Sequence, residues 1–275
     1  MALTGAMSAG ISGLKAHMEA LNTVGNNVAN VNTYGYKPGR VTFRESIYST
    51  QAAGSAGTNM VGGTNPRQTG YGCSIGTIDL DMTTSSLEST GMPTDCFIQG
   101  DGFFLVGPKD VDVNNAEDAK ALSLSRVGDF RFDSDGYLVD GAGNVVYGFV
   151  TCNMDGADQA DEAGTNGDGI STQLVPIRLP MKAVGDAAQG DIKPGDALFP
   201  GVDDTGHNVP AEEGTDAENS TGDCIAYNSL KIDSNGQVSC VNDDTGDPVV
   251  VGYIALGKVT NPNGLEHTEG PYFTA

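Results

Sequence analysis

The clearest pattern along the chain is a run of apolar residues near the N-terminus, spaced alternately four and three residues apart. Gly25 occupies the one vacant step of this run, which consists of Met7, Ile11, Leu14, Met18, Leu21 and Val28. The spacing is typical of the contact stripe of a coiled coil and predicts a helix over residues 3 to about 32. Such a helix commonly packs on its own core, so the stripe alone leaves open whether its partner is this chain or another.

A polar stretch ends the predicted helix and precedes a chain with a different pattern. Asn and Gly tolerate the backbone angles of a helix terminus, and both are frequent here. We expect this stretch to form a hinge between a helix and a separate body, through Asn26, Asn27, Asn30, Asn32, Gly35, Tyr36 and Lys37.

Residues 33–72 are low in apolar density and include the small-residue run 52–57 and the pair Gly62-Gly63. This composition is typical of a linker. A segment of this length without strong periodicity is unusual in a compact domain, so we expect an extended linker that has a function or is mobile.

Strand patterns begin at Cys73 and dominate the remainder. Period-2 alternation over 73–82 predicts a strand, and Gly-rich turns between apolar runs predict hairpins at 100–102, 133–136, 140–144 and 233–236. The first of these turns, Gly100-Asp101-Gly102, leads into Phe103 and Phe104, which we assign to the β core. The fold class is therefore mainly β with an N-terminal helix. A central β domain spans 73–150 and 225–275, and 151–224 is a loop-rich insertion or reduced outer domain.

The charge of the chain excludes several partners. Acidic residues number 36 against 14 basic ones, giving a formal net charge of -22. Nucleic acid is excluded as a partner, because its binding requires Lys and Arg to neutralise phosphates, and anionic membrane surfaces are disfavoured likewise. The chain has no apolar run long enough to span a bilayer, and we identify no cleavable secretory signal.

Candidate chemistry is sparse. The five cysteines form no CxxC pair and are interpreted as small core residues, although one bonded pair stays open. Oxygen-rich loops at 133–136, 155–168, 233–236 and 242–247 lack the register of an EF-hand, so turn chemistry explains them better than calcium does. No Gly-x-Ser-x-Gly, Walker or His-Glu-x-x-His motif occurs. We expect no enzyme, catalytic residue, metal site or cofactor.

Several phrases, taken together and in order, resemble the flagellar axial proteins, the rod and hook family of bacterial flagella. The stretch 21–37 looks like that family's N-terminal motif, and the Gly-Gly-Thr-Asn-Pro phrase of 62–72 is similar to its hook proteins. Residues 99–104 match the β-domain signature. The set is completed by 91–95, 126–130, 254–266 and 270–273, and the resemblance covers roughly 1–150 and 225–275.

The resemblance implies a structural subunit of the flagellar hook, which polymerises into a hollow flexible joint passing torque from rod to filament. Expected partners are copies of itself, other axial proteins (rod, hook cap, hook–filament junction) and the flagellar export apparatus. The expected location is the flagellum, outside the cell after export. A distal rod protein is the alternative, because 182–222 is short for a hook outer domain. A secreted acidic calcium-binding β protein or adhesin is the second alternative.

One departure from the family concerns the partner of the apolar stripe. The family ends with a second heptad helix that pairs with the first, whereas this sequence stops at Ala275. The expectation is that the N-terminal stripe lacks its intramolecular partner and that the chain alone forms no stable native tubes.

Overall fold

The computed structural model describes residues 2–83, 89–109, 118–152, 169–170, 174–183, 197–198, 220–268 and 270–274. The chain divides into two compact units, Met1–Thr83 and Thr84–Ala275, and each is considered by itself. The described part of unit 1 contains a long helix and two ribbons of paired strands, and that of unit 2 is built mostly from strands. The prediction of a mainly β chain with an N-terminal helix is confirmed.

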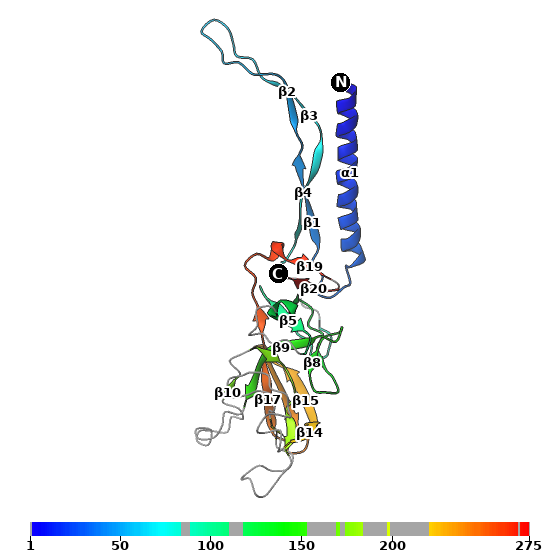
Figure 1. Ribbon diagram of the computed structural model, residues 1–275, viewed down its shortest axis with the longest axis vertical. Helices are drawn as coiled ribbons and strands as arrows, with labels where there is room; N and C mark the ends of the chain where they lie inside the picture. Colours follow the sequence, from blue (N-terminus) through cyan, green and yellow to red (C-terminus); the bar gives the residue numbers. More distant parts are fainter. Residues whose placement is uncertain are drawn as a thin grey trace. The chain divides into compact units, whose positions relative to one another are not determined.

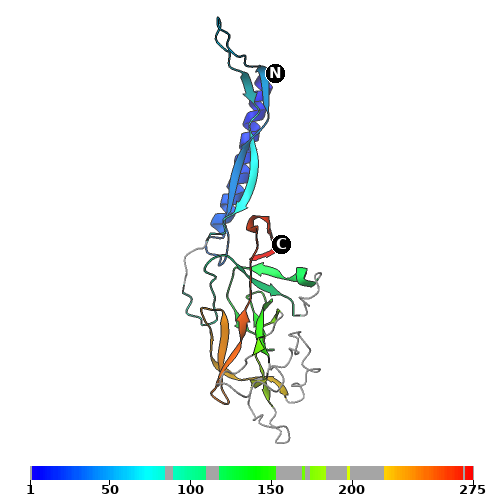
Figure 2. The ribbon, with the colours of Figure 1, turned by 90° about the vertical axis from the view of Figure 1, so that its left-hand side faces the viewer.

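In unit 1, helix α1 (Ala2–Ala29) lies along a ribbon of two antiparallel strands (Figures 1 and 2). That ribbon pairs β1 (Gly39–Glu45) with β4 (Cys73–Leu80). A second antiparallel ribbon pairs β2 (Tyr48–Ala52) with β3 (Arg67–Gly70) and continues the first. The chain leaves the helix through turns after Ala29, and Gly35 adopts φ 70° there, a left-handed conformation that favours glycine.

The β1–β4 ribbon has an apolar and a polar face. Register places Val41 opposite Ile78, and Phe43 opposite Ile75, with a bulge between Val41 and Phe43. The bulge opposes two residues of β4 to one of β1, which keeps Ile75 and Ile78 on the same face despite their odd spacing. The other face carries polar pairs across the two strands, Arg40 with Asp79, Thr42 with Thr77 and Arg44 with Ser74.

These ribbons differ from the predicted organisation. The linker predicted over 33–72 contains three paired strands, and the strand predicted to open the central domain is β4, which pairs with β1 instead. The boundary between the units therefore follows Thr83 rather than residue 72. The glycine-rich composition of 52–63 concealed the ribbon, because the glycines belong to the connection between β2 and β3.

The described part of unit 2 is dominated by one large antiparallel sheet with the order β15-β16-β17-β9-β5-β6-β20-β19. Its strands are β5 (Phe103–Gly107), β6 (Ser123–Ser125), β9 (Val145–Cys152), β15 (Tyr227–Ile232), β16 (Gln237–Asn242), β17 (Pro248–Ile254), β19 (Glu266–His267) and β20 (Tyr272–Thr274). Shorter strands pair at its margins, namely β7 (Arg131–Phe132), β8 (Leu138–Val139), β10 (Gly169–Ile170), β11 (Val175–Pro176) and β18 (Leu256–Gly257).

A separate small sheet has the order β13-β12-β14. Its strands are β12 (Met181–Ala183), β13 (Ala197–Leu198) and β14 (Ser220–Cys224). Two short 3-10 helices complete the described elements, η1 (Asp118–Ala121) and η3 (Pro262–Gly264).

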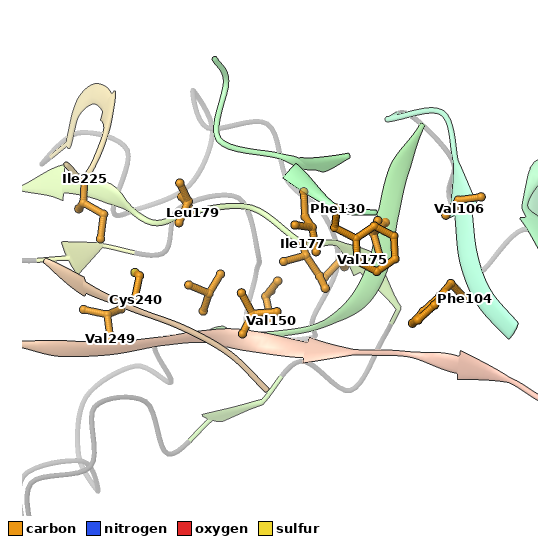
Figure 3. Packing of buried hydrophobic residues seen from close by; sticks show 14 of the residues in the cluster. Phe104, Val106, Phe130, Val150, Val175, Ile177, Leu179, Ile225, Cys240 and Val249 are labelled. Carbon is orange, nitrogen blue, oxygen red and sulfur yellow. The ribbon is translucent and has the colours of Figure 1, made fainter. Parts of the chain in front are cut away.

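One hydrophobic cluster forms the core of unit 2 (Figure 3). It draws Phe104 and Val106 from β5, Val150 from β9, and Val249 from β17. Val175, Ile177 and Leu179 also belong to this cluster, and Ile177 is fully buried. The segment 174–181 is therefore part of the core, which corrects its assignment to a loop-rich insertion spanning 151–224; residues 153–168, 171–173, 184–196 and 199–219 of that insertion lie outside the described residues.

Three of the predicted hairpins are confirmed. β7 pairs with β8 across 133–136, β8 with β9 across 140–144, and β15 with β16 across 233–236. The Asp133 carboxylate accepts the backbone N–H groups of Asp135 and Tyr137, as expected of an Asx turn. The fourth prediction was wrong: β5 pairs with β6, β9 and β18 and not with 96–99, because Gly100 and Gly102 turn the chain without returning it alongside itself.

Candidate assembly surface

Helix α1 presents its small residues to the ribbon. The positions that are shielded recur at helical spacing, and Ala16, only 4% exposed, lies at their centre. These inward positions are occupied by Ala9, Ser12, Ala16, Ala20, Thr23 and Asn27. Small side chains let the helix backbone approach the strands closely, so this face is used within the chain.

Close approach is most evident where β4 begins. Gly72, at φ 107°, lies so near the helix that a Cβ atom there would overlap Ser12 Oγ and come within 3.1 Å of the Ala9 backbone. Ser12 Oγ donates to the Tyr71 carbonyl at 3.4 Å. Further along the helix, the rings of His17 and Phe43 lie 5.2 Å apart. The helix and the ribbon therefore form one packed body.

The large apolar residues of the helix point the other way. The predicted stripe is exposed at each of its six positions, between 51% and 67%, and we name this set the apolar seam: Met7, Ile11, Leu14, Met18, Leu21 and Val28. At 3.6 residues per turn, the seam and the inward face are centred on nearly opposite sides of the helix. Single exposed apolar residues are ordinary, but a continuous stripe along a helix is typical of an interaction surface.

Three exposed residues extend the seam beyond the predicted set, namely Val24, Val31 and Tyr34. Val24 and Val31 lie next to Val28 on the helix or its continuation, so the apolar surface widens toward the end of α1. These apolar residues are visible in the sequence, but a strict four-three spacing does not include residues that flank the stripe. The inward face could also be predicted from the sequence, because small residues occur at positions 9, 12, 16, 20 and 23.

The Asn-rich stretch forms a network of hydrogen bonds, and we call residues 26–39 the corner. Asn27 bonds to both backbone groups of Gly39 in β1, and the Tyr36 hydroxyl donates to Asn27 Oδ1 at 2.9 Å. Asn26 Nδ2 donates to the Tyr36 hydroxyl, and Asn30 Nδ2 donates to Asn26 Oδ1 at 3.0 Å. The corner thus links the end of the helix to the start of the ribbon.

The remaining residues of the predicted hinge differ in burial and in backbone conformation. Lys37 is buried, and its Nζ donates to the Thr83 carbonyl at 2.9 Å. Asn32 is exposed, and Gly35 provides the positive φ of the turn. Burial raises the pKa of Tyr36 above its ordinary value, because the charged phenolate is disfavoured away from water.

The predicted β-domain motif lies in unit 2 and is structural. Phe103 and Phe104 are both 3% exposed; Phe103 meets Phe273 edge-on, and Phe104 meets Phe130. Gly100 has φ 118° and Gly102 has φ 147°. The Gly100 carbonyl accepts a hydrogen bond from Arg126, whose guanidinium also lies over the Phe103 ring. The motif therefore joins the start of β5 to the segment after β6, and Asp101 is exposed beside it.

The β2–β3 ribbon is a further exposed surface of unit 1. Nearly every residue of its two strands is exposed, and the connection carries Met60 at 96% and Val61 at 68%. A bridge between Ser55 and Thr64 prolongs the pairing into the connection. An uncovered two-stranded ribbon is marginally stable in water, so a partner that covers it would stabilise it.

Comparison with known proteins relates parts of this chain to proteins of the bacterial flagellum. A model described as flagella basal body rod protein matches residues 7–37, the seam and most of the corner. The chain is 42% identical over 147 residues to the flagellar basal-body rod protein FlgG of Bacillus subtilis, covering 54% of this chain and 50% of that one. It is 36% identical over 169 residues to the flagellar hook protein FlgE of Borreliella burgdorferi (61% and 35%) and 34% over 181 residues to that of Treponema pallidum (66% and 35%).

This chain is similar to flagellar axial proteins of both the rod and the hook. It spans half or less of the length of these curated relatives. Both rod and hook proteins are among them, so the similarity by itself does not separate the two.

The charge of the chain is divided unequally between its units. Residues 1–83 contain five basic and four acidic residues, leaving nine basic and 32 acidic residues in 84–275 out of the totals of 14 and 36. Unit 1 is thus close to neutral, and the net negative charge resides in unit 2. The apolar seam belongs to the unit that carries almost no electrostatic self-repulsion.

The described part of the chain has little of the chemistry that other kinds of site need. It contains no cluster of three or more His, Cys, Asp or Glu side chains arranged to hold a metal ion, although the acidic run 155–168 lies outside it. No helix within it has the length and apolarity needed to cross a membrane. Cys73, Cys96, Cys224 and Cys240 are free thiols. Burial raises the pKa of Cys240 to about 11, as expected of a core thiol.

Proposed function

We propose that this chain belongs to a structural subunit of the bacterial flagellar hook, which polymerises into the hollow joint that passes torque from rod to filament. Its partners are further copies of the chain and other axial proteins, and it reaches the outside of the cell through the flagellar export apparatus. Its working residues are those of a packing surface rather than of a catalytic site.

The apolar seam is the observation that carries this proposal. The inward face of α1 is already occupied by the ribbon, so the seam is available to a helix from outside unit 1. Burying a Leu or Met side chain contributes roughly 1.5–3 kcal/mol, so six such positions supply ample free energy for association. The four-three spacing fits a helix of the same kind as the partner.

The test introduces charge into the seam. In the complete protein, within its own bacterium, Leu14→Asp combined with Leu21→Asp is expected to abolish motility and to leave no assembled structure by electron microscopy. The control, Ser8→Asp combined with Lys15→Gln, changes the net charge by the same amount at exposed positions off the seam. Because seam residues are exposed in the chain itself, both double variants should keep the wild-type circular dichroism. Normal assembly by the seam variant would refute the proposal.

A distal rod protein is the second candidate, and the identity of 42% to a rod protein favours it. The two are separated by where the protein is found. Immunogold labelling of isolated hook–basal bodies is expected to decorate the curved hook. Label confined to the straight rod would assign the rod function, while the seam test above would still apply.

A further inference from the structure

The corner is the part of unit 1 where side-chain hydrogen bonds are most concentrated, and the side chains that form these bonds are not part of the apolar seam. We infer that Asn27 is a positioning residue that fixes the end of helix α1 against strand β1, so that residues 26–39 form a rigid corner and not a hinge. The geometry is independent of the proposed function; only its consequence for a polymer rests on that function.

Asn27 occupies the place of a neighbouring strand at the edge of β1. Its Oδ1 accepts the Gly39 N–H at 3.0 Å, and its Nδ2 donates to the Gly39 carbonyl at 2.9 Å. Exchange of both backbone groups with one partner is the bonding of an antiparallel residue pair. On its other edge, Gly39 lies opposite Leu80 of β4. The side-chain amide therefore makes the helix a third member of the ribbon at this point.

The conformation of Asn27 is itself held. Its Oδ1 accepts a second hydrogen bond, from the Tyr36 hydroxyl at 2.9 Å, which satisfies both acceptor positions of that oxygen. Asn26 Nδ2 donates to the same hydroxyl at 3.1 Å. Two consecutive asparagines and one tyrosine are thus linked by a chain of hydrogen bonds. This chain accounts for an asparagine pair followed by an aromatic residue in this stretch.

The helix also lies close to β1 one turn earlier. A Cβ atom on Gly39 would come within 3.1 Å of Thr23 Cγ2 and within 3.5 Å of Ile78 Cγ2. Thr23 and Asn27 are four residues apart, so they lie on the same face of the helix. The space beside Gly39 is therefore narrow at one turn of the helix, and hydrogen bonds hold Gly39 at the next.

A hinge needs a segment whose backbone can change without loss of contacts. Rotation of α1 away from β1 would break both bonds to Gly39 at once and move Thr23 away from the strand. In a polymer, the orientation of the apolar seam relative to the ribbon would then be a fixed property of each subunit. Bending of the assembly would have to occur between subunits or outside residues 26–39.

The test measures position and bonding in the complete chain by nuclear magnetic resonance. In Asn27→Ala, exchange of the Gly39 amide proton is expected to accelerate at least 10-fold, and the nuclear Overhauser effect between the Thr23 methyl and Gly39 Hα to fall by more than half. Asn27→Asp keeps the acceptor and loses the donor, so it should restore protection of the Gly39 amide relative to Asn27→Ala. Amides in the middle of α1 should exchange at wild-type rates in all variants, which excludes general unfolding.

Asn32→Ala is the matched control, because Asn32 is an exposed asparagine of the same stretch and its removal should change neither signal. Unchanged Gly39 protection and an unchanged Overhauser effect in Asn27→Ala would overturn the inference. So would an Asn27→Asp variant that protects Gly39 no better than Asn27→Ala. Because these readouts are made on the unassembled chain, they stand or fall separately from the effect of seam variants on polymerisation.

Discussion

Tyr272 links the strand β20 to the turn between β8 and β9. Its hydroxyl donates to Asp140 Oδ2 at 2.6 Å, and the other oxygen of that carboxylate accepts the backbone N–H groups of Ala142 and Asn144. Burial, together with the hydrogen bond to Asp140, raises the pKa of Tyr272 to about 12. The neutral phenol is therefore the form that the folded state prefers.

This setting predicts a dependence of stability on alkaline pH. An unfolded tyrosine titrates near 10, so the contribution of Tyr272 is fully present below that pH and is lost as pH rises from about 10 to about 12. Wild-type protein is expected to exceed Tyr272→Phe in free energy of unfolding at pH 8, and the difference should shrink above pH 10. Denaturant unfolding at a series of pH values measures it. A constant difference across that range would contradict the assignment.

Gly72 predicts a large effect from a small substitution. Gly72→Ala forces a side chain into a left-handed backbone conformation and against Ser12 and Ala9 of the helix. Overpacking and backbone strain together should destabilise unit 1 by roughly 2–4 kcal/mol. Thermal unfolding followed at the helical circular dichroism signal measures the loss.

Gly62→Ala is the control for this substitution, because a Cβ atom at Gly62 meets nothing within 4 Å. Its unfolding temperature is expected to match that of the wild type or to rise slightly. If the two alanine variants lost equal stability, the close approach of β4 to α1 could not be the cause.

Among the elements, the β2–β3 ribbon should be the least protected. Its strands are exposed on both faces and pair only with each other, so local opening costs little. Hydrogen–deuterium exchange followed by mass spectrometry should label 48–52 and 67–70 within seconds, while β9 and β17 in the core of unit 2 stay protected for at least a hundred times longer. Equal protection of the ribbon and of β17 would show that something in the chain covers it.

An element could be predicted from the sequence when many of its apolar residues follow one regular spacing. Helix α1 was predicted almost to its ends because its large residues keep one spacing over three heptads, from Met7 to Val28. The β1–β4 ribbon was not, because its apolar face has only four large residues and a bulge changes their parity at Ile75. The absence of a hairpin at 100–102 has a similar cause: positive φ at two glycines permits a turn without specifying where the next strand pairs.

The partner of the apolar seam could not be predicted from residue spacing either. Its spacing identified an interaction stripe, but the sequence alone left its partner open. The structure shows that small residues on the opposite side, such as Ala9 and Ala16, already contact the ribbon. That distribution of sizes is what separates the inward from the outward face, and the four-three count does not record it.

For the whole molecule, the division of charge sets how association responds to salt. Unit 1, which carries the seam, is almost neutral, whereas 32 acidic and nine basic residues lie in 84–275. Copies joined through unit 1 bring these like-charged units near one another, which opposes assembly at low ionic strength. The seam itself is apolar, so its contribution does not depend on charge.

Self-association of the chain is therefore expected to strengthen as salt is raised. The Debye length shortens from about 30 Å at 0.01 M to about 8 Å at 0.15 M, which screens repulsion between the acidic units over that interval. Sedimentation velocity at fixed protein concentration should show association increasing several-fold between these salt concentrations and levelling off beyond them.

Two other outcomes have different causes. If salt acted by strengthening the burial of the apolar seam, association would keep increasing above about 0.5 M and would be stronger in sulfate than in chloride at equal ionic strength. Association that weakens with salt would mean that attraction between charges, and not the apolar seam, holds the copies together. Leu14→Asp with Leu21→Asp should remain monomeric at every salt concentration, because screening removes repulsion but supplies no contact.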